Sequence, residues 1–395
     1  MTETQNDPAT MAIAEFADFG RTTQRVERDG LTYFVNEFWT ARQRQSSRLH
    51  EISYRACFKA ELPRFFIERL TAPGDLVYDP FMGRGTTLLE AAILGRRAAG
   101  NDINPLSAML IGPRLDPPAL EDVAAKLAEI DFGADAETNP DLDVFFHPET
   151  LRQISALRAL LLGQGDQLDR AGRWIRMIAL NRLTGHSSGF FSVYTLPPNQ
   201  AVSVQSQRRI NERRAQMPPL RNVRDIILKK SRLMLRDAPS LTDAPAILST
   251  GPASRTPALP DASVSLVVTS PPFLDIVDYA ADNWLRCWFA GIDPATVAID
   301  KHRTVADWTA FVRTTLTELG RIVQPGGHIA FEVGEVRNGK VLLENHVAEA
   351  SQGLPLELLG VIVNEQRFTK TANVWGVGNN AAGTNTNRIC LFRRQ

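Results

Sequence analysis

The sequence predicts an α/β fold, in which helices cover a mostly parallel sheet and a mainly helical segment interrupts the sheet-forming chain. A strand, a glycine turn, a helix and a second strand follow one another between residues 75 and 102. Apolar strand patterns resume late in the chain, at residues 264–270, 328–334, 356–365 and 388–392. Between these two regions, residues 148–237 have a mainly helical pattern, interrupted at residues 186–198.

The first of these regions is a βαβ unit. Residues 75–79 (DLVYD) form a short apolar strand, residues 86–94 an apolar-faced helix ending at Gly95, and residues 97–102 a second strand. Such a unit implies parallel strands. Residues 35–70 have a helical pattern, with Pro63 suited to a helix start. We also expect a helix near residues 119–130, and a linker over the Pro/Ser/Thr-rich residues 237–260.

The bulk composition is that of a soluble globular protein. With 395 residues, 44% hydrophobic and 22% charged, the chain fits one large α/β domain with an insertion, or two modest domains. It opens without a secretory pattern and has no apolar run of membrane-spanning length, so we expect a cytoplasmic protein without a membrane partner. Cys57, Cys287 and Cys390 lie far apart without a CxxC pair, so neither disulfides nor a metal site is expected.

Charge is unevenly distributed although the formal net charge is +0. Residues 150–236 contain 16 Lys or Arg against 4 Asp or Glu, which leaves 28 basic and 40 acidic residues elsewhere. A basic surface for a polyanion on an acidic body would have this distribution, as would a solvated arginine-rich helical face.

The turn after the first strand has the features of a nucleotide-type cofactor site. Gly83 and Gly85 let the backbone approach a ligand and aim helix amides at it, and Asp102 ends the next strand, where a carboxylate can accept from ribose hydroxyls. A GxG turn also fits an NAD enzyme. Here the third glycine of the dinucleotide pattern is missing, and Asp79 opens the turn, well placed for a positively charged sulfonium cofactor. These details favour S-adenosylmethionine.

A second motif, Ser270-Pro271-Pro272-Phe273, follows a later apolar strand. An exocyclic amino nitrogen of a nucleobase is a poor nucleophile, so a catalyst must orient it with hydrogen-bond acceptors. The hydroxyl oxygen of Ser270 and the carbonyl oxygen of Pro271 can accept from the two amino hydrogens. Pro271 and Pro272 stiffen the loop, and Phe273 can stack on an extruded base. The motif predicts methyl transfer to an amino group.

Together, the two motifs resemble those of the DNA N4-cytosine and N6-adenine methyltransferases. The resemblance covers roughly residues 45–110 and 260–395, and implies a Rossmann-like methyltransferase fold with a mostly parallel seven-stranded sheet and S-adenosylmethionine as cofactor. The segment His50–Pro63 is similar to the segment that closes over the cofactor in that family. The predicted cofactor residues are Phe58, Leu62, Asp79, Pro80, Phe81, Gly83, Gly85, Thr86, Thr87, Asp102, Ile103 and Asn104.

The resemblance also bears on the target. In this family Ser before Pro-Pro usually accompanies cytosine N4, so Ser270 favours N4-methylation. N6-adenine methylation is the first alternative, RNA base methylation a second, and an idle nucleic-acid-binding protein a third. Methylation at carbon 5 needs a thiolate, usually after a proline, and no cysteine of this chain follows one.

The order of the motifs resembles enzymes that insert target recognition between the cofactor and catalytic halves. We divide the chain into an N-terminal, partly flexible extension (1–34), a cofactor half (35–148), a basic helical insertion (149–245) and a catalytic half (246–395). Double-stranded DNA is the expected partner, and the sequence does not decide between monomer and homodimer. The predicted phosphate contacts are Arg208, Arg209, Arg213, Arg214, Lys229 and Lys230. The glycine-rich residues 368–387 fit a pocket-covering loop, a DNA-contacting loop or a hairpin tip.

Overall fold

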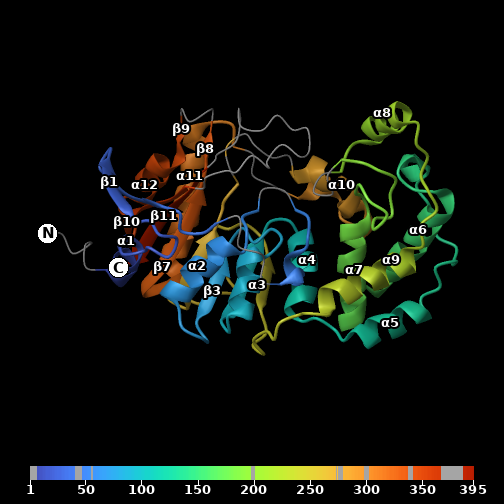
Figure 1. Cartoon of the computed structure of the whole chain (residues 1–395), viewed down its shortest axis with the longest axis horizontal. Helices are drawn as coiled ribbons and strands as arrows, with labels where there is room; N and C mark the ends of the chain where they lie inside the picture. Colours follow the sequence, from blue (N-terminus) through green and yellow to red (C-terminus); the bar gives the residue numbers. More distant parts are fainter. Residues whose placement is uncertain are drawn as a thin grey trace.

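The computed structural model describes residues 7–40, 47–54, 57–196, 201–272, 274, 279–297, 302–336, 341–365 and 386–395. A sheet-containing part and a helical part lie next to each other along the long axis of the molecule (Figure 1). Phe273 and residues 368–385, for which we predict roles in the target pocket and in a loop, lie outside the described residues.

The sheet has nine strands in the order β1-β2-β10-β11-β7-β6-β3-β4-β5. Strands β7, β6, β3, β4 and β5 are parallel to their neighbours in that row, whereas β11 is antiparallel to both β7 and β10. The strands are β1 (Gln24–Arg28), β2 (Leu31–Asn36), β3 (Leu76–Asp79), β4 (Arg97–Asp102), β5 (Ile247–Thr250), β6 (Val264–Thr269), β7 (Val323–Val333), β10 (Leu356–Glu365) and β11 (Thr386–Arg394).

The seven strands from β10 to β5 form the Rossmann-like sheet that we expected, and the hairpin β1–β2 extends it. Strand β2 runs parallel to β10, with Tyr33 beside Val361. The part of the chain that we predict to be an N-terminal extension therefore contributes two strands, together with helix α1 (Pro8–Ala14). A separate short pair, β8 (Glu335–Val336) and β9 (Val341–Leu342), follows β7.

Helices cover both faces of this sheet. Helices α2 (Glu61–Leu70) and α3 (Thr86–Ile93) bury Phe66 and Leu88 in a core cluster on one face. Helices α11 (Val305–Ile322) and α12 (Leu343–Ser351) bury Trp308 and Val347 in a second cluster on the other face. The apolar side chains of the central strands alternate between the two clusters, as the pleat of a sheet covered on both sides requires.

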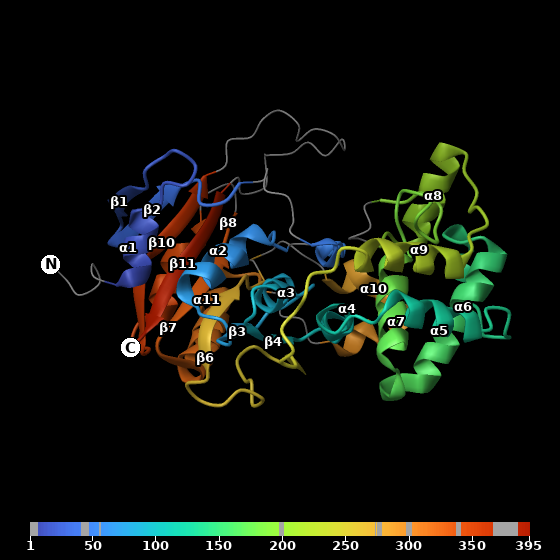
Figure 2. The same ribbon diagram turned by 60° about the horizontal axis from the view of Figure 1, so that its bottom comes forward.

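The helical part contains α5 (Leu120–Glu129), α6 (Pro148–Gln164), α7 (Arg170–Arg182), α8 (Val204–Arg214) and α9 (Val223–Leu235). Helices α5, α7 and α9 pack on one another, and α10 (Tyr279–Ala290), from the later part of the chain, packs against α6 and α7. Helix α4 (Leu106–Leu115) joins the two parts through its contacts with α3 and α7. Helix α8 projects from the top of the helical part, as a second view shows (Figure 2).

Two expectations about local structure were wrong. Among the described residues of the predicted helical region 35–70, only residues 61–70 form an α-helix, with Pro63 in its first turn; residues 35–36 end β2, and a 3₁₀ turn covers Arg48–His50. The predicted linker 237–260 contains β5, whose side chains are half-buried or exposed because it is an edge strand. Within the described ranges, no helix combines the length and apolarity needed to cross a membrane.

Candidate active site

The glycine turn lies between β3 and α3, where the carboxyl ends of parallel strands meet. Gly83 and Gly85 both have positive φ angles, 49° and 75°, which favour glycine. A Cβ on Gly85 would lie only 2.4 Å from Ile111 Cγ1, so this position also lacks room for a side chain. Thr86 and Thr87 open α3 and are buried, as are Asp79 and Pro80 at the end of β3.

Asp102 at the end of β4 holds the glycine turn from the neighbouring strand. One carboxylate oxygen accepts from the Gly83 amide at 2.8 Å and the other from the Asn104 amide at 2.9 Å. Burial raises the pKa of this carboxyl group, and these hydrogen bonds oppose that shift. Each oxygen keeps a further lone pair, so the carboxylate can still accept from a ligand hydroxyl. Ile103 beside it is half-buried.

Asp79 connects the glycine turn with β6. Its Oδ1 accepts from the Thr269 hydroxyl at 2.6 Å and from the Phe81 amide at 3.0 Å. The Thr87 hydroxyl donates to the Val268 carbonyl, a second link between α3 and β6. Burial raises the pKa of Asp79 to about 7, against the opposing effect of the hydrogen bond from Thr269.

The described residues of His50–Pro63, the pre-strand segment that precedes β3, lie against the glycine turn. A Cβ on Gly83 would meet Cys57 Sγ at 3.5 Å and Tyr54 Cε1 at 3.7 Å. Arg84 donates to the carbonyl oxygens of Ile52 and Phe58, and so links two points of this segment to the glycine turn. The described residues of this segment therefore lie against the glycine turn, and their role in closing over a cofactor stays a prediction.

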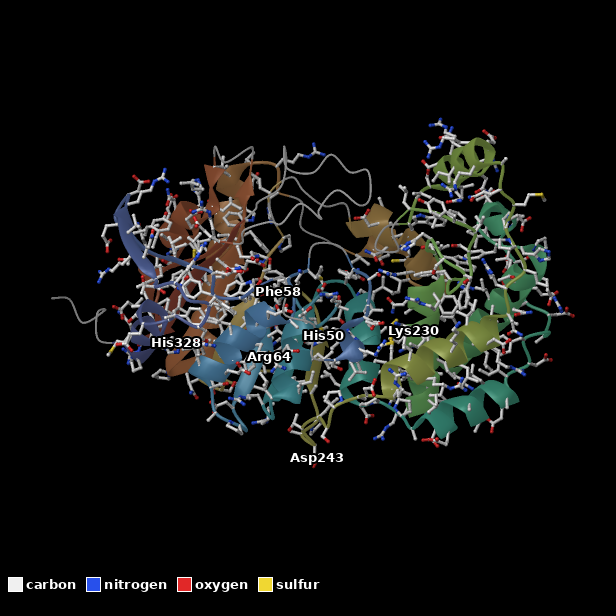
Figure 3. All side chains as sticks on the ribbon, viewed as in Figure 1. His50, Phe58, Arg64, Lys230, Asp243 and His328 are labelled. Atoms are coloured by element: carbon white, nitrogen blue, oxygen red, sulfur yellow. The ribbon has the colours of Figure 1, made fainter. Side chains whose placement is uncertain are left out.

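Phe58 and Leu62 differ in their surroundings. Phe58 is half-buried beside the apolar core, whereas Leu62 is 1% exposed within it. Nearby, the buried Glu90 of α3 accepts from Arg64 of α2 at 2.8 Å and is 2.6 Å from His50 Nε2 (Figure 3). This charged group fastens the pre-strand segment to the helix that begins at the cofactor turn.

Ser270 follows β6 directly and comes one residue after Thr269, whose hydroxyl donates to Asp79. Pro271 is buried, Pro272 is half-buried, and the Pro272 carbonyl oxygen accepts from Trp308 Nε1 of α11 at 2.9 Å. The same helix carries Phe311, whose ring lies 5.6 Å from that of Phe81. The Ser-Pro-Pro loop and the glycine turn are thus held on one edge of the sheet by a common helix.

Glu332 is a site residue that the sequence analysis did not identify. It lies in β7, next to β6, and is 7% exposed. The Ser270 side chain and the Asn387 amide of β11 both hydrogen-bond to its carboxylate. A signal was present in the sequence, because an acidic residue within the apolar strand Ile-Ala-Phe-Glu-Val is unusual at a buried position.

The predicted phosphate contacts fall into two groups. Arg208, Arg209, Arg213 and Arg214 are exposed on α8, and the Arg214 guanidinium lies 3.8 Å from the centre of the Tyr194 ring. Lys229, on α9, is exposed too. The Lys230 amine is instead paired with Glu51 at 2.7 Å where α9 meets the pre-strand segment, and 10% of its side chain is exposed.

The polar amide side chains of α8 bond to other residues within the helical part. Gln207 is fully buried, and its amide donates to the Tyr194 carbonyl and to Asn211 Oδ1. Asn211 in turn donates to the Val144 carbonyl at 2.7 Å. These amides hold α8 on the helical part, which leaves its arginines as the outward-facing groups.

The turn fits S-adenosylmethionine on the chemistry of its donors and acceptors. Asp79 is a fully buried carboxylate whose hydrogen-bond partners, the hydroxyls of Thr269 and Thr87 and the Phe81 amide, are neutral, so a cationic ligand beside it would offset its desolvation. Asp102 offers acceptors at the end of the next strand, and the glycines leave the backbone accessible between them. Fold and turn together define a Rossmann-like methyltransferase.

Comparison with known protein families narrows the class of methyltransferase that the chain resembles. The DNA methylase family profile, which covers N6 and N4 enzymes, matches residues 15–109, roughly a quarter of the chain. These residues are similar to the N4/N6 DNA methylase family, whose methyl donor is S-adenosylmethionine. The match includes the glycine turn and Asp102, and begins ahead of residue 45, where the resemblance in the sequence begins.

Three known proteins are similar to parts of the chain. The type II methyltransferase M.MjaII of Methanocaldococcus jannaschii is 36% identical over 62 residues, 16% of this chain and 12% of that protein. M.BsoBI of Geobacillus stearothermophilus, also a type II methyltransferase, is 41% identical over 64 residues, 16% of this chain and 13% of that protein. The chain thus matches only about an eighth of these relatives' length. The structure of TrmN from Thermus thermophilus is 11% identical over 86% of this chain and 50% of that one, with a TM-score of 0.35.

Proposed function

We propose that the chain is a DNA methyltransferase that transfers a methyl group from S-adenosylmethionine to the N4 amino group of a flipped-out cytosine. The observation that carries the proposal is the position of Ser270, one residue after the hydroxyl that bonds to Asp79 of the cofactor turn. An acceptor for amino hydrogens therefore stands beside the site that fits a methyl donor.

The chain's own residues supply orientation. The Ser270 hydroxyl oxygen and the Pro271 carbonyl oxygen accept from the two amino hydrogens, which turns the nitrogen lone pair toward the methyl group. The hydrogen bond from Trp308 to the Pro272 carbonyl holds the loop in place before the target arrives. S-adenosylmethionine supplies an activated methyl group on a sulfonium that leaves as a neutral thioether.

The exposed arginines of α8 give the proposed enzyme a surface for the DNA backbone. Four of them occupy one short helix that projects from the top of the helical part (Figure 1). Each neutralised phosphate releases counterions, so such contacts strengthen binding without selecting a sequence. Lys230 is left out of this surface, because its amine is committed to Glu51.

Methyl transfer in vitro tests the proposal. The purified full chain is incubated with S-adenosylmethionine carrying a tritiated methyl group, and with duplex DNA from a host that lacks methyltransferases or with total RNA. We expect label in the DNA, none in the RNA, and none in DNA treated with the Ser270→Ala variant. Label confined to RNA would overturn the DNA assignment, and full activity of Ser270→Ala would overturn the role of Ser270.

A further inference from the structure

We propose that Glu332 is the proton acceptor of the methyl-transfer reaction and works through the hydroxyl group of Ser270. The inference rests on the proposed function, because it gives a role to a residue behind the same catalytic loop. Glu332 does not touch the target itself, so it is a positioning residue that also receives the proton.

The sheet register brings the two residues together. Strands β6 and β7 are parallel, and Thr269 lies beside Phe331. The residue after Thr269 is Ser270, which follows β6, and the residue after Phe331 is Glu332. Their two side chains are hydrogen-bonded. The Ser270 hydroxyl donates its proton to the carboxylate, so its oxygen lone pairs remain free to accept from an amino group.

The surroundings of Glu332 lack a compensating cation among the described residues. Its partners are Ser270 from β6 and the Asn387 amide from β11, both neutral. Arg388 of β11 pairs with the buried Glu344 of α12, 2.7 Å away. Ionising a buried carboxyl group that has no cation beside it is unfavourable. Glu332 therefore lowers the stability of the fold relative to a neutral side chain at the same position.

Two other titratable side chains lie near Glu332. Asp79 reaches the same end of β6 through Thr269, and Cys390 of β11 lies beside Phe331, one residue before Glu332. Arg367 and Lys370, which precede β11 in the chain, lie outside the described residues. The groups described around Glu332 would therefore keep its proton affinity high.

Burial indeed raises the pKa of Glu332 to about 7, and the hydrogen bonds from Asn387 and Ser270 oppose the shift. An ordinary glutamate is too weak a base to hold a proton at neutral pH. A carboxyl group that titrates near the working pH is suited to accept a proton during the reaction and to release it afterwards.

The step balances without another reactant. The bond between sulfur and the methyl carbon breaks as the bond between that carbon and the amino nitrogen forms, which leaves a neutral thioether and a positively charged nitrogen. The nitrogen loses one hydrogen as a proton to Ser270 Oγ, while Ser270 passes its own hydroxyl proton to the Glu332 carboxylate. The products are the neutral methylated base and a neutral carboxylic acid, which returns its proton to water.

A purely structural role makes a different prediction. The hydrogen bond between Glu332 and Asn387 joins β7 to β11, and a glutamine could accept the same bond. If Glu332 only holds the two strands together, Glu332→Gln should retain activity and its pH dependence. If it accepts the proton, the variant should fold, bind S-adenosylmethionine and fail in the transfer step.

Single-turnover transfer rates between about pH 6 and pH 9 test the inference, with the full chain, labelled S-adenosylmethionine and duplex DNA from a methylation-free host. We expect the wild-type rate to rise to a plateau above about pH 7. Glu332→Gln should be roughly 100-fold slower or worse and lack this rise, with unchanged S-adenosylmethionine affinity by calorimetry, and Glu332→Asp should recover part of the rate.

The matched control is Glu344→Gln, a buried glutamate on α12 paired with Arg388, whose pH profile should keep the wild-type shape. A wild-type rate and pH profile in Glu332→Gln would overturn the inference. If Glu332→Gln does not fold, two other measurements test the inference: nuclear magnetic resonance of the wild-type chain with carboxyl-labelled glutamate, and the transfer rate of Glu332→Asp. The absence of a glutamate carboxyl group that titrates near pH 7 would contradict the inference. A wild-type chain that methylates no DNA would instead refute the proposed function.

Discussion

At Gly85, the positive φ angle and the lack of space for a Cβ atom both disfavour any residue other than glycine. Replacing Gly85 by Ala combines a positive φ of 75° with a Cβ placed 2.4 Å from Ile111, which belongs to the buried core. Gly74 has a similar φ of 89° but nothing within 4 Å of an added Cβ, so Gly74→Ala isolates the conformational strain. We expect Gly74→Ala to lower the free energy of unfolding by about 1 kcal/mol and Gly85→Ala by about 3 kcal/mol or more.

Urea denaturation measures both variants, and calorimetry measures their affinity for S-adenosylmethionine. Gly85→Ala should lose affinity because the turn shifts, whereas Gly74→Ala, at the start of β3 and away from the turn, should keep it. Equal destabilisation of the two variants would mean that the Ile111 contact adds nothing to the requirement for glycine at position 85.

Glu332 should make the fold less stable at alkaline pH. Its pKa in the folded chain is about 7, above the ordinary 4.5, so the folded state keeps a proton that the unfolded state releases between these values. The fold therefore loses stability as pH rises from about 4.5 to about 7, and the loss is complete above that range. Glu332→Gln does not ionise and should gain about 3 kcal/mol relative to wild type between pH 4.5 and pH 8, as an upper bound.

Urea denaturation of both proteins at about pH 5 and about pH 8 measures this difference. A stability difference that stays the same at the two pH values would contradict the raised pKa of Glu332. A gain in stability together with a loss of activity would be the behaviour of a group kept for function rather than for folding.

Ser270 and Glu332 show which site residues a single sequence reveals. Ser270 stands in a local motif whose chemistry can be read from adjacent residues. Glu332 has its partners at Ser270 and Asn387, far away in the chain, and only the strand order brings the three together. Likewise, Lys230 lies near the end of the insertion, whereas its partner Glu51 lies near the start of the preceding cofactor half. The sequence shows the charge of Lys230 but not this partner, and therefore predicts a DNA contact.

At the scale of elements, α8 is the part of the basic segment that faces outward. Arg209 and Arg213 are one turn apart on this helix, and neither is in an ion pair among the described residues. Replacing both by Ala should weaken DNA binding and reduce the slope of log K against log salt concentration by about 2, if each meets one phosphate. S-adenosylmethionine affinity should not change.

Fluorescence anisotropy with duplex DNA at several salt concentrations measures the slope. The matched control replaces Arg25 and Arg28 by Ala, which removes the same charge from β1 at the opposite edge of the sheet. If both double variants lose the same slope, binding responds to net charge rather than to α8, and the assignment of this helix to DNA contact is wrong.

The elements with a strong local pattern were predictable from the sequence. Strands β3, β4, β6 and β10 and helix α3 lie within one or two residues of the expected positions, because buried parallel strands are almost continuously apolar. Strand β5 was missed because an edge strand needs little apolar sequence, and its segment is rich in Pro, Ser and Thr. The hairpin β1–β2 was missed because β1 is exposed along its whole length and is defined by its pairing with β2.

At the scale of the whole molecule, one hydrogen bond joins segments 190 residues apart, Asp79 in the cofactor half and Thr269 in the catalytic half. Thr269→Val keeps the shape of the side chain and removes the donor, which should cost about 1 to 3 kcal/mol of stability. The hydrogen bond lowers the pKa of Asp79, so its loss should raise that pKa above about 7. Less Asp79 is then ionised at neutral pH.

Calorimetry with S-adenosylmethionine checks this prediction. We expect Thr269→Val to bind about tenfold more weakly than wild type at pH 7, and the deficit to shrink at about pH 9, where Asp79 is ionised in both proteins. A deficit of the same size at both pH values would show that the charge of Asp79 does not hold the cofactor.

The most direct test of the central claim is the identity of the modified base. The full chain is expressed in a bacterial host that lacks DNA methyltransferases, the DNA is digested to nucleosides, and mass spectrometry measures the methylated bases, with Ser270→Ala as the control. We predict N4-methylcytosine with the wild-type chain and none with the variant. N6-methyladenine would replace the cytosine assignment within the same family, and the absence of any methylated base from DNA of cells that contain the folded protein would contradict the claim.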